Sequence, residues 1–336
     1  MSLPPLLEVK NLKKHFDARK NMFARKSSVK AVDGVSFSVL PQESFAVVGE
    51  SGCGKTTLGK LILALEQPTS GQVCFGGMDV GAMDRAALKT MRREMQVIFQ
   101  DPYSSLNPRM SVEDIITEPW VIHGMHMDPA QRAEKLARLL DDCGIAKSYL
   151  PRHPHEFSGG QRQRVGIARA LALDPKLIVA DEPVSALDVS IQAQILNLLK
   201  DLQKERKLAY LFISHDFSVV RHLCTRIAVM YLGRIVETAD SETIFNNPQH
   251  PYTEALLSAV PVPDPAIEKR RKRIILSGDV PSPLKPPPGC RFHPRCRYLE
   301  NSCRTDDPML TEARPGHQAA CPVLPFKDEP SAAALV

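Results

Sequence analysis

One glycine-rich stretch limits what this chain can fold into more than any other. The sequence GESGCGKTT spans residues 49–57, directly after the apolar run FAVV and at the start of a helical pattern. Gly49 and Gly54 permit a tight turn and a close approach of the backbone to a ligand. The loop N–H groups and the N-terminus of the next helix attract phosphate oxygens. The stretch therefore predicts a phosphate-binding loop between a strand and a helix.

The side chains of this loop predict a nucleotide as its ligand. Lys55 would add a positive charge near the β- and γ-phosphates, and Thr56 would place a hydroxyl on Mg²⁺. The candidate nucleotide-binding residues of the loop are Gly49, Glu50, Ser51, Gly52, Cys53, Gly54, Lys55, Thr56 and Thr57.

Short apolar runs of strand length alternate with helical patterns along most of the chain, which predicts an α/β fold with a mostly parallel sheet. Between about residues 101 and 163 the pattern turns helical, so we expect a helical insert there. After about residue 258 the sequence becomes rich in proline and charge. We expect a nucleotide-binding domain at residues 1–257 and a small cysteine-rich extension at 258–336.

A second acidic element fits the same chemistry. Residues 177–183 read LIVADEP, so Asp181 and Glu182 emerge at the carboxyl end of an apolar strand. Open α/β sheets bind ligands at that end. Asp181 would hold Mg²⁺ through its hydration shell, and Glu182 is the candidate to polarise the attacking water.

A further helix N-terminus lies about 100 residues beyond the first. Residues 157–161 read FSGGQ and precede a helix, which makes a second site suited to an anion. One γ-phosphate cannot lie at both helix ends unless a second molecule contributes. The chain here resembles the ATP-binding cassette (ABC) ATPases, whose signature motif FSGGQ matches. The residues concerned are Ser158, Gly159, Gly160 and Gln161.

The resemblance extends from residue 8 to about 240 and implies a RecA-like core with a helical subdomain. It implies ATP and Mg²⁺ as ligands, Gln100 as the Q-loop residue near Mg²⁺, and Asp188 as the end of the D-loop SALD. It also implies that His215 is the catalytic switch histidine. Phe16 occupies the position of an aromatic residue that stacks on adenine, although the family more often has Tyr or Trp there. The alternative is that Phe16 is an ordinary core residue.

The C-terminal part carries a resemblance of its own. Residues 246–261, NNPQHPYTEALLSAVP, and the later stretch GCRFHPRC are similar to the terminal region of bacterial dipeptide and oligopeptide importer ATPases. This resemblance implies a subunit that powers peptide import, paired head to tail with a second ATPase. Two membrane permeases and an external peptide-binding protein complete the implied complex. Importers of nickel or another small solute are the first alternative, and a soluble cassette acting on nucleic acid is the second.

Composition bears on location and on that last alternative. No signal-peptide pattern and no apolar run long enough to cross a bilayer is found in the sequence. We expect a peripheral protein on the cytoplasmic face of the bacterial inner membrane. The net charge is +5, and basic residues cluster at residues 10–30 and 269–273. No nucleic-acid fold signature accompanies these clusters, so we expect no nucleic-acid partner.

Half of the eight cysteines lie near the C-terminus, at Cys290, Cys296, Cys303 and Cys321. A reduced compartment disfavours disulfides, so these thiols are candidate ligands of zinc or of an iron–sulfur cluster. Zinc sites usually contain closer pairs. The importer resemblance implies a [4Fe–4S] cluster, with Zn²⁺ as the alternative.

The surroundings of these cysteines suggest how the site would be used. Four arginines are interleaved with them, and we expect their charge to offset an anionic centre. The extension is separated in sequence from every nucleotide motif. We therefore expect the metal to be a structural staple for a segment that has little core of its own. The arginines are Arg291, Arg295, Arg297 and Arg304.

Overall fold

The computed structural model describes residues 4–17, 28–261 and 273–326, and the chain divides into two compact units. The first unit comprises Met1–Leu7, Val39–Glu43 and Phe75–Phe212, and the second comprises Glu8–Ser38, Ser44–Cys74 and Ile213–Val336. Residues 18–27 of the first basic cluster and residues 269–272 of the second lie outside the described residues. In the described part of the chain, no helix is both long and apolar enough to span a bilayer.

The first unit contains parallel strands at its centre. β6 (Met95–Ile98) pairs in parallel with β7 (Leu177–Asp181), with Met95 opposite Leu177 and Ile98 opposite Ala180. β8 (Ala209–Ser214) begins beside β7, where the Ala209 N–H donates to the Lys176 carbonyl at 2.9 Å. β7 and β8 are buried along most of their length, as apolar runs in a parallel sheet require. The prediction of an α/β fold with a parallel sheet is confirmed.

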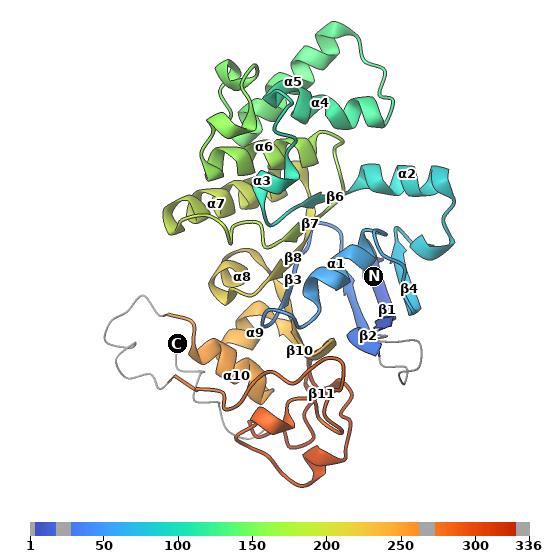
Figure 1. The fold of residues 1–336 in the computed structure, drawn as a ribbon, viewed down its shortest axis with the longest axis vertical. Helices are drawn as coiled ribbons and strands as arrows, with labels where there is room; N and C mark the ends of the chain where they lie inside the picture. The colour runs from blue at the N-terminus through green and yellow to red at the C-terminus, as the bar shows by residue number, and fades with distance from the viewer. Residues whose placement is uncertain (1–3, 18–27, 262–272, 327–336) are drawn as a thin grey trace. The chain divides into compact units, whose positions relative to one another are not determined.

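Helices α3 to α6 of the first unit lie together beyond these strands (Figure 1). Local sequence explains two of their boundaries: Ser111 and Asp114 form a capping box at the start of α4, and Gly144, with a φ of 62°, ends α5. Trp120 of α4 donates its indole N–H to the carbonyl of Ala172, just after α6. The helices are α2 (Arg85–Glu94), α3 (Pro102–Ser105), α4 (Val112–Ile122), α5 (Pro129–Cys143), α6 (Gly159–Leu171) and α7 (Val189–Arg206).

The second unit combines parallel and antiparallel pairing. β3 (Ser44–Val48) pairs in parallel with β9 (Arg226–Tyr231), and β9 pairs in antiparallel fashion with β10 (Arg234–Asp240). β12 (His317–Ala319) continues the sheet beside β10, and β11 (Thr311–Arg314) lies at its edge. A smaller sheet contains β2 (Ser28–Val39), β1 (Leu7–Asp17) and β4 (Ser70–Phe75) in that order. The helices are α1 (Lys55–Ile62), α8 (Phe217–Leu223), α9 (Ser241–Asn246) and α10 (Pro251–Ser258).

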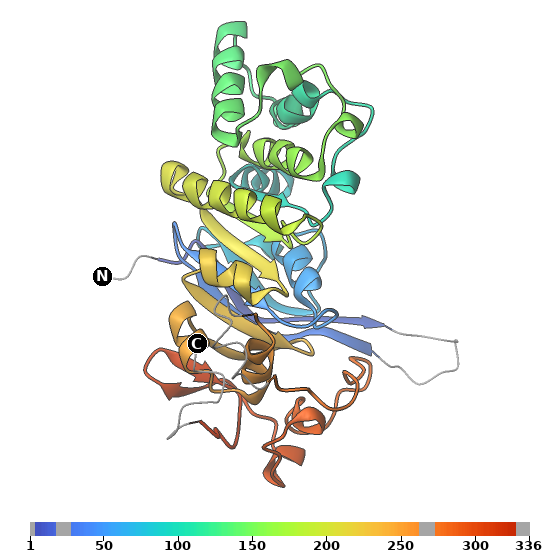
Figure 2. The same cartoon turned by 90° about the vertical axis from the view of Figure 1, so that its left-hand side faces the viewer.

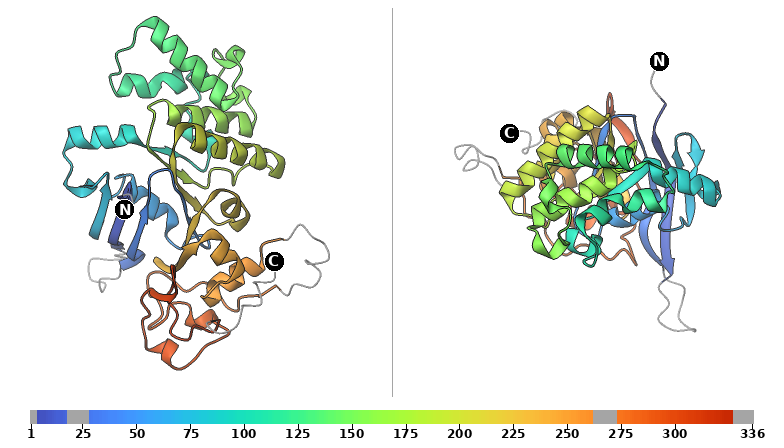
Figure 3. Two further views of the ribbon diagram at one scale, coloured as in Figure 1. Left: turned by 180° about the vertical axis from the view of Figure 1, so that it is seen from behind. Right: turned by 90° about the horizontal axis from the view of Figure 1, so that it is seen from above.

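Residues 273–326 pack within the second unit, beside α9 and α10 (Figures 2 and 3). Phe292 is buried, and its ring centroid lies 5.4 Å from those of both Tyr231 and Tyr252. Glu237 on β10 accepts a hydrogen bond from His317 Nε2 at 2.6 Å. The expectation that this segment has little core of its own is therefore incomplete, because it shares the core of the second unit.

Candidate functional site

The phosphate-binding loop curves tightly between β3 and α1 in the second unit. A Cβ at Gly49 would lie 2.2 Å from the Met230 carbonyl oxygen, and one at Gly54 would lie 2.0 Å from the Ala31 carbonyl oxygen. Only glycine fits either position without movement of the backbone. Lys55 is buried and donates from Nζ to the Gly49 carbonyl at 2.7 Å. The loop thus holds a buried ammonium against a tight backbone turn at the start of α1, which suits an anion site.

Glu50 of this loop is held by residues from the C-terminal part of the same unit. Its N–H donates to Tyr252 Oη at 2.8 Å, and its carboxylate pairs with Arg295 Nη1 at 2.7 Å. Sequence analysis missed both contacts, because they join positions 202 and 245 residues apart. This C-terminal part is far from the nucleotide motifs in the sequence, but in the structure it contacts the phosphate-binding loop.

The candidate catalytic carboxylate and the Q-loop glutamine meet in the first unit. Glu182 follows β7 with a φ of +47°, a left-handed conformation that is uncommon outside glycine. Gln100 Nε2 donates to Glu182 Oε2 at 2.8 Å. Such strained backbone is often found at functional sites.

The signature motif and the D-loop also meet in the first unit. Ser158 caps α6: its N–H donates to Gln161 Oε1 at 3.0 Å, and its Oγ accepts from the Gln161 N–H at 3.4 Å. A Cβ at Gly160 would lie 2.4 Å from Cγ2 of Ile191, which belongs to the first turn of α7. Asp188 caps α7, and hydrogen bonds from the Ile191 N–H and the Ser190 hydroxyl lower its pKa. The two motifs therefore depend on close contact between α6 and α7.

The segment after Gln100 is attached to α6 as well. Arg169 Nη1 donates to the Ser105 carbonyl at 2.6 Å. The guanidinium of Arg162 lies 3.6 Å from the ring centroid of Tyr103. The Q-loop segment and the signature helix are thus bonded within one unit.

Two predicted residues lie in the second unit together with the phosphate-binding loop. His215 is exposed directly after β8. Phe16 is 39% exposed, and Lys14 Nζ lies 4.9 Å from its ring centroid. The alternative that Phe16 is an ordinary core residue is wrong, and its ring is available for stacking.

Comparison with known proteins decides the family. The ABC transporter family model matches residues 32–185, and the model for the C-terminal region of oligopeptide/dipeptide transporters matches residues 236–303. The putative oligopeptide transport ATP-binding protein YkfD of Bacillus subtilis is 52% identical over 94% of this chain and 95% of its own length. The dipeptide transport ATP-binding protein DppF of Escherichia coli is 51% identical over 94% of each chain. The chain belongs to the peptide-transport branch of the ABC ATPases.

Solved structures agree with this assignment. The ABC protein MJ0796, in a dimer bound to ADP and phosphate, is 27% identical, with a TM-score of 0.62 over 70% of this chain and 98% of that one. The cbiO1 protein of Clostridium perfringens, part of a cbiONQ transporter complex, is 26% identical, with a TM-score of 0.63 over 72% of this chain and 90% of its own. The P-loop fold of an ABC ATPase is therefore shown, and this chain is an ATP-hydrolysing subunit of that family.

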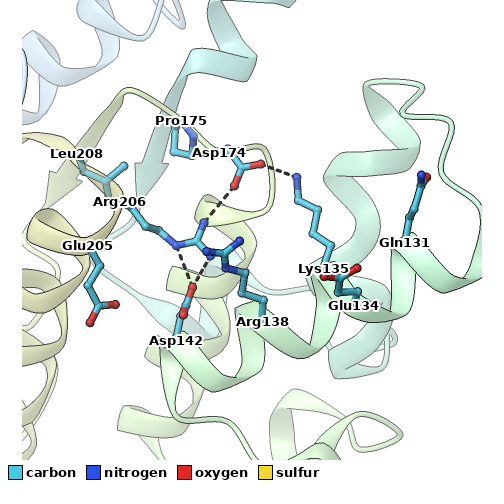
Figure 4. Close-up of a pocket in the computed structure, with 10 residues that line it drawn as sticks. All are labelled: Gln131, Glu134, Lys135, Arg138, Asp142, Asp174, Pro175, Glu205, Arg206 and Leu208. Carbon is cyan, nitrogen blue, oxygen red and sulfur yellow. Dashed lines mark hydrogen bonds and ion pairs between the residues drawn. The ribbon is translucent and has the colours of Figure 1, made fainter.

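A prominent groove in this ABC ATPase lies elsewhere in the first unit (Figure 4). It has a volume of about 510 Å³ and lies between α5, the turn at Asp174 and the end of α7. Its charges are largely paired: Arg206 contacts Asp142 and Asp174, and Lys135 contacts Asp174. None of the predicted site residues lines it, so we assign it no part in ATP chemistry.

The four C-terminal cysteines of the ABC ATPase interact with one another in the second unit. Burial raises the pKa of Cys290 to about 12, and the thiols of Cys321, Cys303 and Cys296 contribute in the same direction. Cys321 Sγ accepts a hydrogen bond from the Leu324 N–H at 3.3 Å. Among the described residues, however, no group of three or more His, Cys, Asp or Glu side chains is arranged to hold a single metal ion.

Three of the interleaved arginines point to carboxylates rather than remaining free to offset the charge of a metal centre. Arg291 pairs with Asp33, Arg295 pairs with Glu50, and Arg297 pairs with Glu254. The expectation that all of them balance the cysteine site is therefore incomplete. Their ion pairs attach the extension to the rest of the second unit.

Proposed function

We propose that this ABC ATPase powers the import of dipeptides and short oligopeptides across a bacterial inner membrane. The observation that carries the proposal is the match of residues 236–303 to the C-terminal region of oligopeptide/dipeptide transporters. Three relatives that are 51% or 52% identical, over 94–96% of their own lengths, are named as oligopeptide or dipeptide transport ATP-binding proteins. Their names support the same substrate class for this chain.

The proposed complex contains a second, homologous ATPase subunit in a head-to-tail pair. Ser158 and Gly160 would act on the ATP that the companion subunit holds, because α6 offers a second anion-binding helix end. Two membrane permeases would receive the energy, and an external binding protein would deliver the peptide. The chain would lie peripherally on the cytoplasmic face of the membrane.

Within this chain, the residues divide between nucleotide binding and catalysis. We assign Lys55 and the loop N–H groups to the phosphates of ATP, and Thr56 and Asp181 to Mg²⁺. Glu182 would polarise the attacking water, and His215 would stabilise the reacting geometry. Charge placement of this kind is the main catalytic resource for phosphoryl transfer. The other proposed nucleotide contacts are Phe16, Gln100 and Asp188.

We also propose a [4Fe–4S] cluster at the four C-terminal cysteines, within an extension at residues 258–336 that follows an ATPase domain at residues 1–257. Mutual interaction among the thiols supports a shared site. Backbone N–H groups two residues further along the chain bond to Cys290 and Cys296, a contact that suits a metal-bound thiolate. A four-iron cluster is held by four cysteine thiolates, and this part of the chain supplies four free cysteines. When bound, such a cluster would supply cross-linking of the extension or electron transfer.

Transport in a reconstituted system tests the proposal. The chain would be co-expressed with its companion ATPase and permeases, placed in liposomes with ATP inside, and given the binding protein outside. We expect uptake of labelled dipeptide that stops when Lys55 is replaced by alanine. Uptake of nickel without peptide uptake would instead support the small-solute alternative.

A further inference from the structure

A buried arginine of the cysteine-bearing extension forms a two-pronged ion pair with the phosphate-binding loop. Arg295 Nη1 lies 2.7 Å from Glu50 Oε2, and Arg295 Nη2 lies 3.1 Å from Glu50 Oε1. The side chain of Arg295 is 7% exposed and that of Glu50 is 27% exposed. Parallel bonds from one guanidinium to both carboxylate oxygens are among the stronger ion-pair geometries.

The same short stretch also supports the backbone of the loop. Phe292, three residues before Arg295, packs against Tyr252, whose hydroxyl accepts the Glu50 N–H at 2.8 Å. On the other side of the peptide, Lys55 Nζ donates to the Glu50 carbonyl at 3.0 Å. The side chain and the backbone of Glu50 are thus both held. The extension supplies Arg295 for the carboxylate, and its Phe292 packs against the tyrosine that accepts the N–H.

Charge gives this arrangement a consequence for ATP. Glu50 is the only acidic residue in GESGCGKTT, and a negative charge in a phosphate-binding loop repels the ligand. Arg295 compensates that charge where it arises. Without Arg295, the carboxylate of Glu50 would lose this two-pronged ion pair within a loop proposed to bind phosphates.

We infer that Arg295 is a positioning residue for the phosphate-binding loop, which neutralises Glu50 so that ATP affinity depends on the folded C-terminal extension. The inference rests on the proposed role of Gly49–Thr57 in binding ATP. It assigns to the extension an action on this chain's own nucleotide site, beyond holding its own fold together.

Substitutions in the Arg295–Glu50 ion pair would change ATP affinity differently if the pair only held the structure together than if Arg295 compensated the charge of Glu50. If the pair only attaches the extension, Arg295→Gln and Glu50→Gln remove the same contact and change ATP affinity in the same direction. If Arg295 compensates Glu50, the two changes act in opposite directions. Arg295→Gln should weaken ATP binding roughly fivefold, as expected for one unit charge acting over a partly screened distance. Glu50→Gln should strengthen ATP binding, and the double variant should return close to the parent.

The experiment measures the Kd of a fluorescent ATP analogue with Mg²⁺ for the full chain at low and high salt. We expect the Arg295→Gln defect to shrink at high salt, because screening weakens the repulsion. Arg295→Lys should keep most of the affinity for ATP, since lysine keeps the positive charge but cannot form two parallel hydrogen bonds to the carboxylate. Arg304→Gln is the matched control: it removes the same charge from an exposed arginine beside Cys303, and should leave the Kd unchanged.

Several results would overturn the inference. One is an Arg295→Gln protein that binds ATP within twofold of the parent, and another is an equal loss in Arg295→Gln and Glu50→Gln. If Arg295→Gln does not fold, Glu50→Gln decides alone, because a fivefold loss there contradicts charge compensation. A parent protein that does not bind the analogue would contradict the proposed ATP site itself, so the two failures are distinguishable.

Discussion

Gln100 and Glu182 are joined by a hydrogen bond of 2.8 Å from Nε2 to Oε2, which links the residues that follow β6 and β7. The bond lies in the first unit, where Glu182 also has its left-handed backbone. It gives the candidate water-polarising carboxylate a fixed orientation. It also makes the position of Glu182 depend on the Q-loop residue.

Replacing Glu182 by Gln should stop hydrolysis and retain ATP binding. Glutamine keeps an acceptor oxygen for the Gln100 amide, so the local structure should persist. Loss of the carboxylate removes general-base assistance, which typically contributes a hundredfold or more. Phosphate release would be measured at saturating ATP, with Glu94→Gln, at the end of α2, as a control that keeps parental turnover. Turnover of Glu182→Gln within about twofold of the parent would remove Glu182 from this role.

Replacing Gln100 by Ala should separate ATP binding from transport. The segment after Gln100 is bonded to α6 through Arg169 and Ser105, so a change at Gln100 can reach the signature helix. We expect the reconstituted complex to retain ATP binding and to lose stimulation of its ATPase by loaded binding protein. Gln96→Ala, which removes the same kind of side chain from β6 itself, serves as the control. Full stimulation and uptake in Gln100→Ala would mean that the signal takes another route.

Two glycines of α6 should respond to alanine with opposite sign. A Cβ at Gly160 would meet Ile191 Cγ2 at 2.4 Å, whereas nothing lies within 4 Å of a Cβ at Gly166. Gly160→Ala should cost about 1–3 kcal/mol through overpacking. Gly166→Ala should add roughly 0.5–1 kcal/mol through helix propensity. Fluorescence of Trp120, the only tryptophan in the chain, reports urea unfolding of the first unit. Destabilisation by both changes would contradict the packing argument.

Acid should loosen the contact of the extension with β2. Burial raises the pKa of Asp33, but hydrogen bonds from His15 and Arg291 and the charges of Arg291 and Lys30 outweigh it, so the pKa falls from 3.8 to about 2. Arg234 lies 3.5 Å from the same carboxylate. A carboxyl group whose pKa is lower in the folded state stabilises the fold at pH values above its unfolded-state pKa. That stabilisation is lost as the pH falls through the folded-state pKa. The contribution, about 2 kcal/mol, should therefore disappear between about pH 4 and pH 2.

Calorimetry of the parent and of Asp33→Asn across this range tests the claim. The gap in melting temperature between the two proteins should be largest above about pH 4 and should close toward pH 2. Asp307→Asn is the control, because Asp307 is half exposed and pairs only with Arg234 among the contacts described. A gap independent of pH would show that the Asp33 carboxylate is not the source.

Local patterns allowed much of the fold and site to be predicted. The apolar runs that became β3 and β7 are continuous because both faces of those strands are buried, and the glycines of the loop after β3 predicted its tight turn. The pairing of Arg295 with Glu50 could not be predicted in this way. A salt bridge between residues 245 positions apart leaves no periodicity or spacing, and an arginine near cysteines is equally compatible with balancing a metal centre. The exposure of Phe16 also depended on tertiary packing, since a single aromatic residue in a strand fits either face.

The cysteine site gives the last prediction. Protein purified without oxygen should contain about four irons and matching sulfide per chain, with a broad absorption band near 400 nm. Cys296→Ser should release the metal and expose the extension to protease, whereas Cys74→Ser, a change at a half-buried cysteine in β4, should do neither. One zinc per chain without iron would contradict the cluster. Because Arg295 precedes Cys296 and contacts Glu50, metal loss should also weaken ATP binding severalfold. If ATP affinity stays unaltered after metal loss, although protease now cuts the extension, the phosphate-binding loop does not depend on the folded extension.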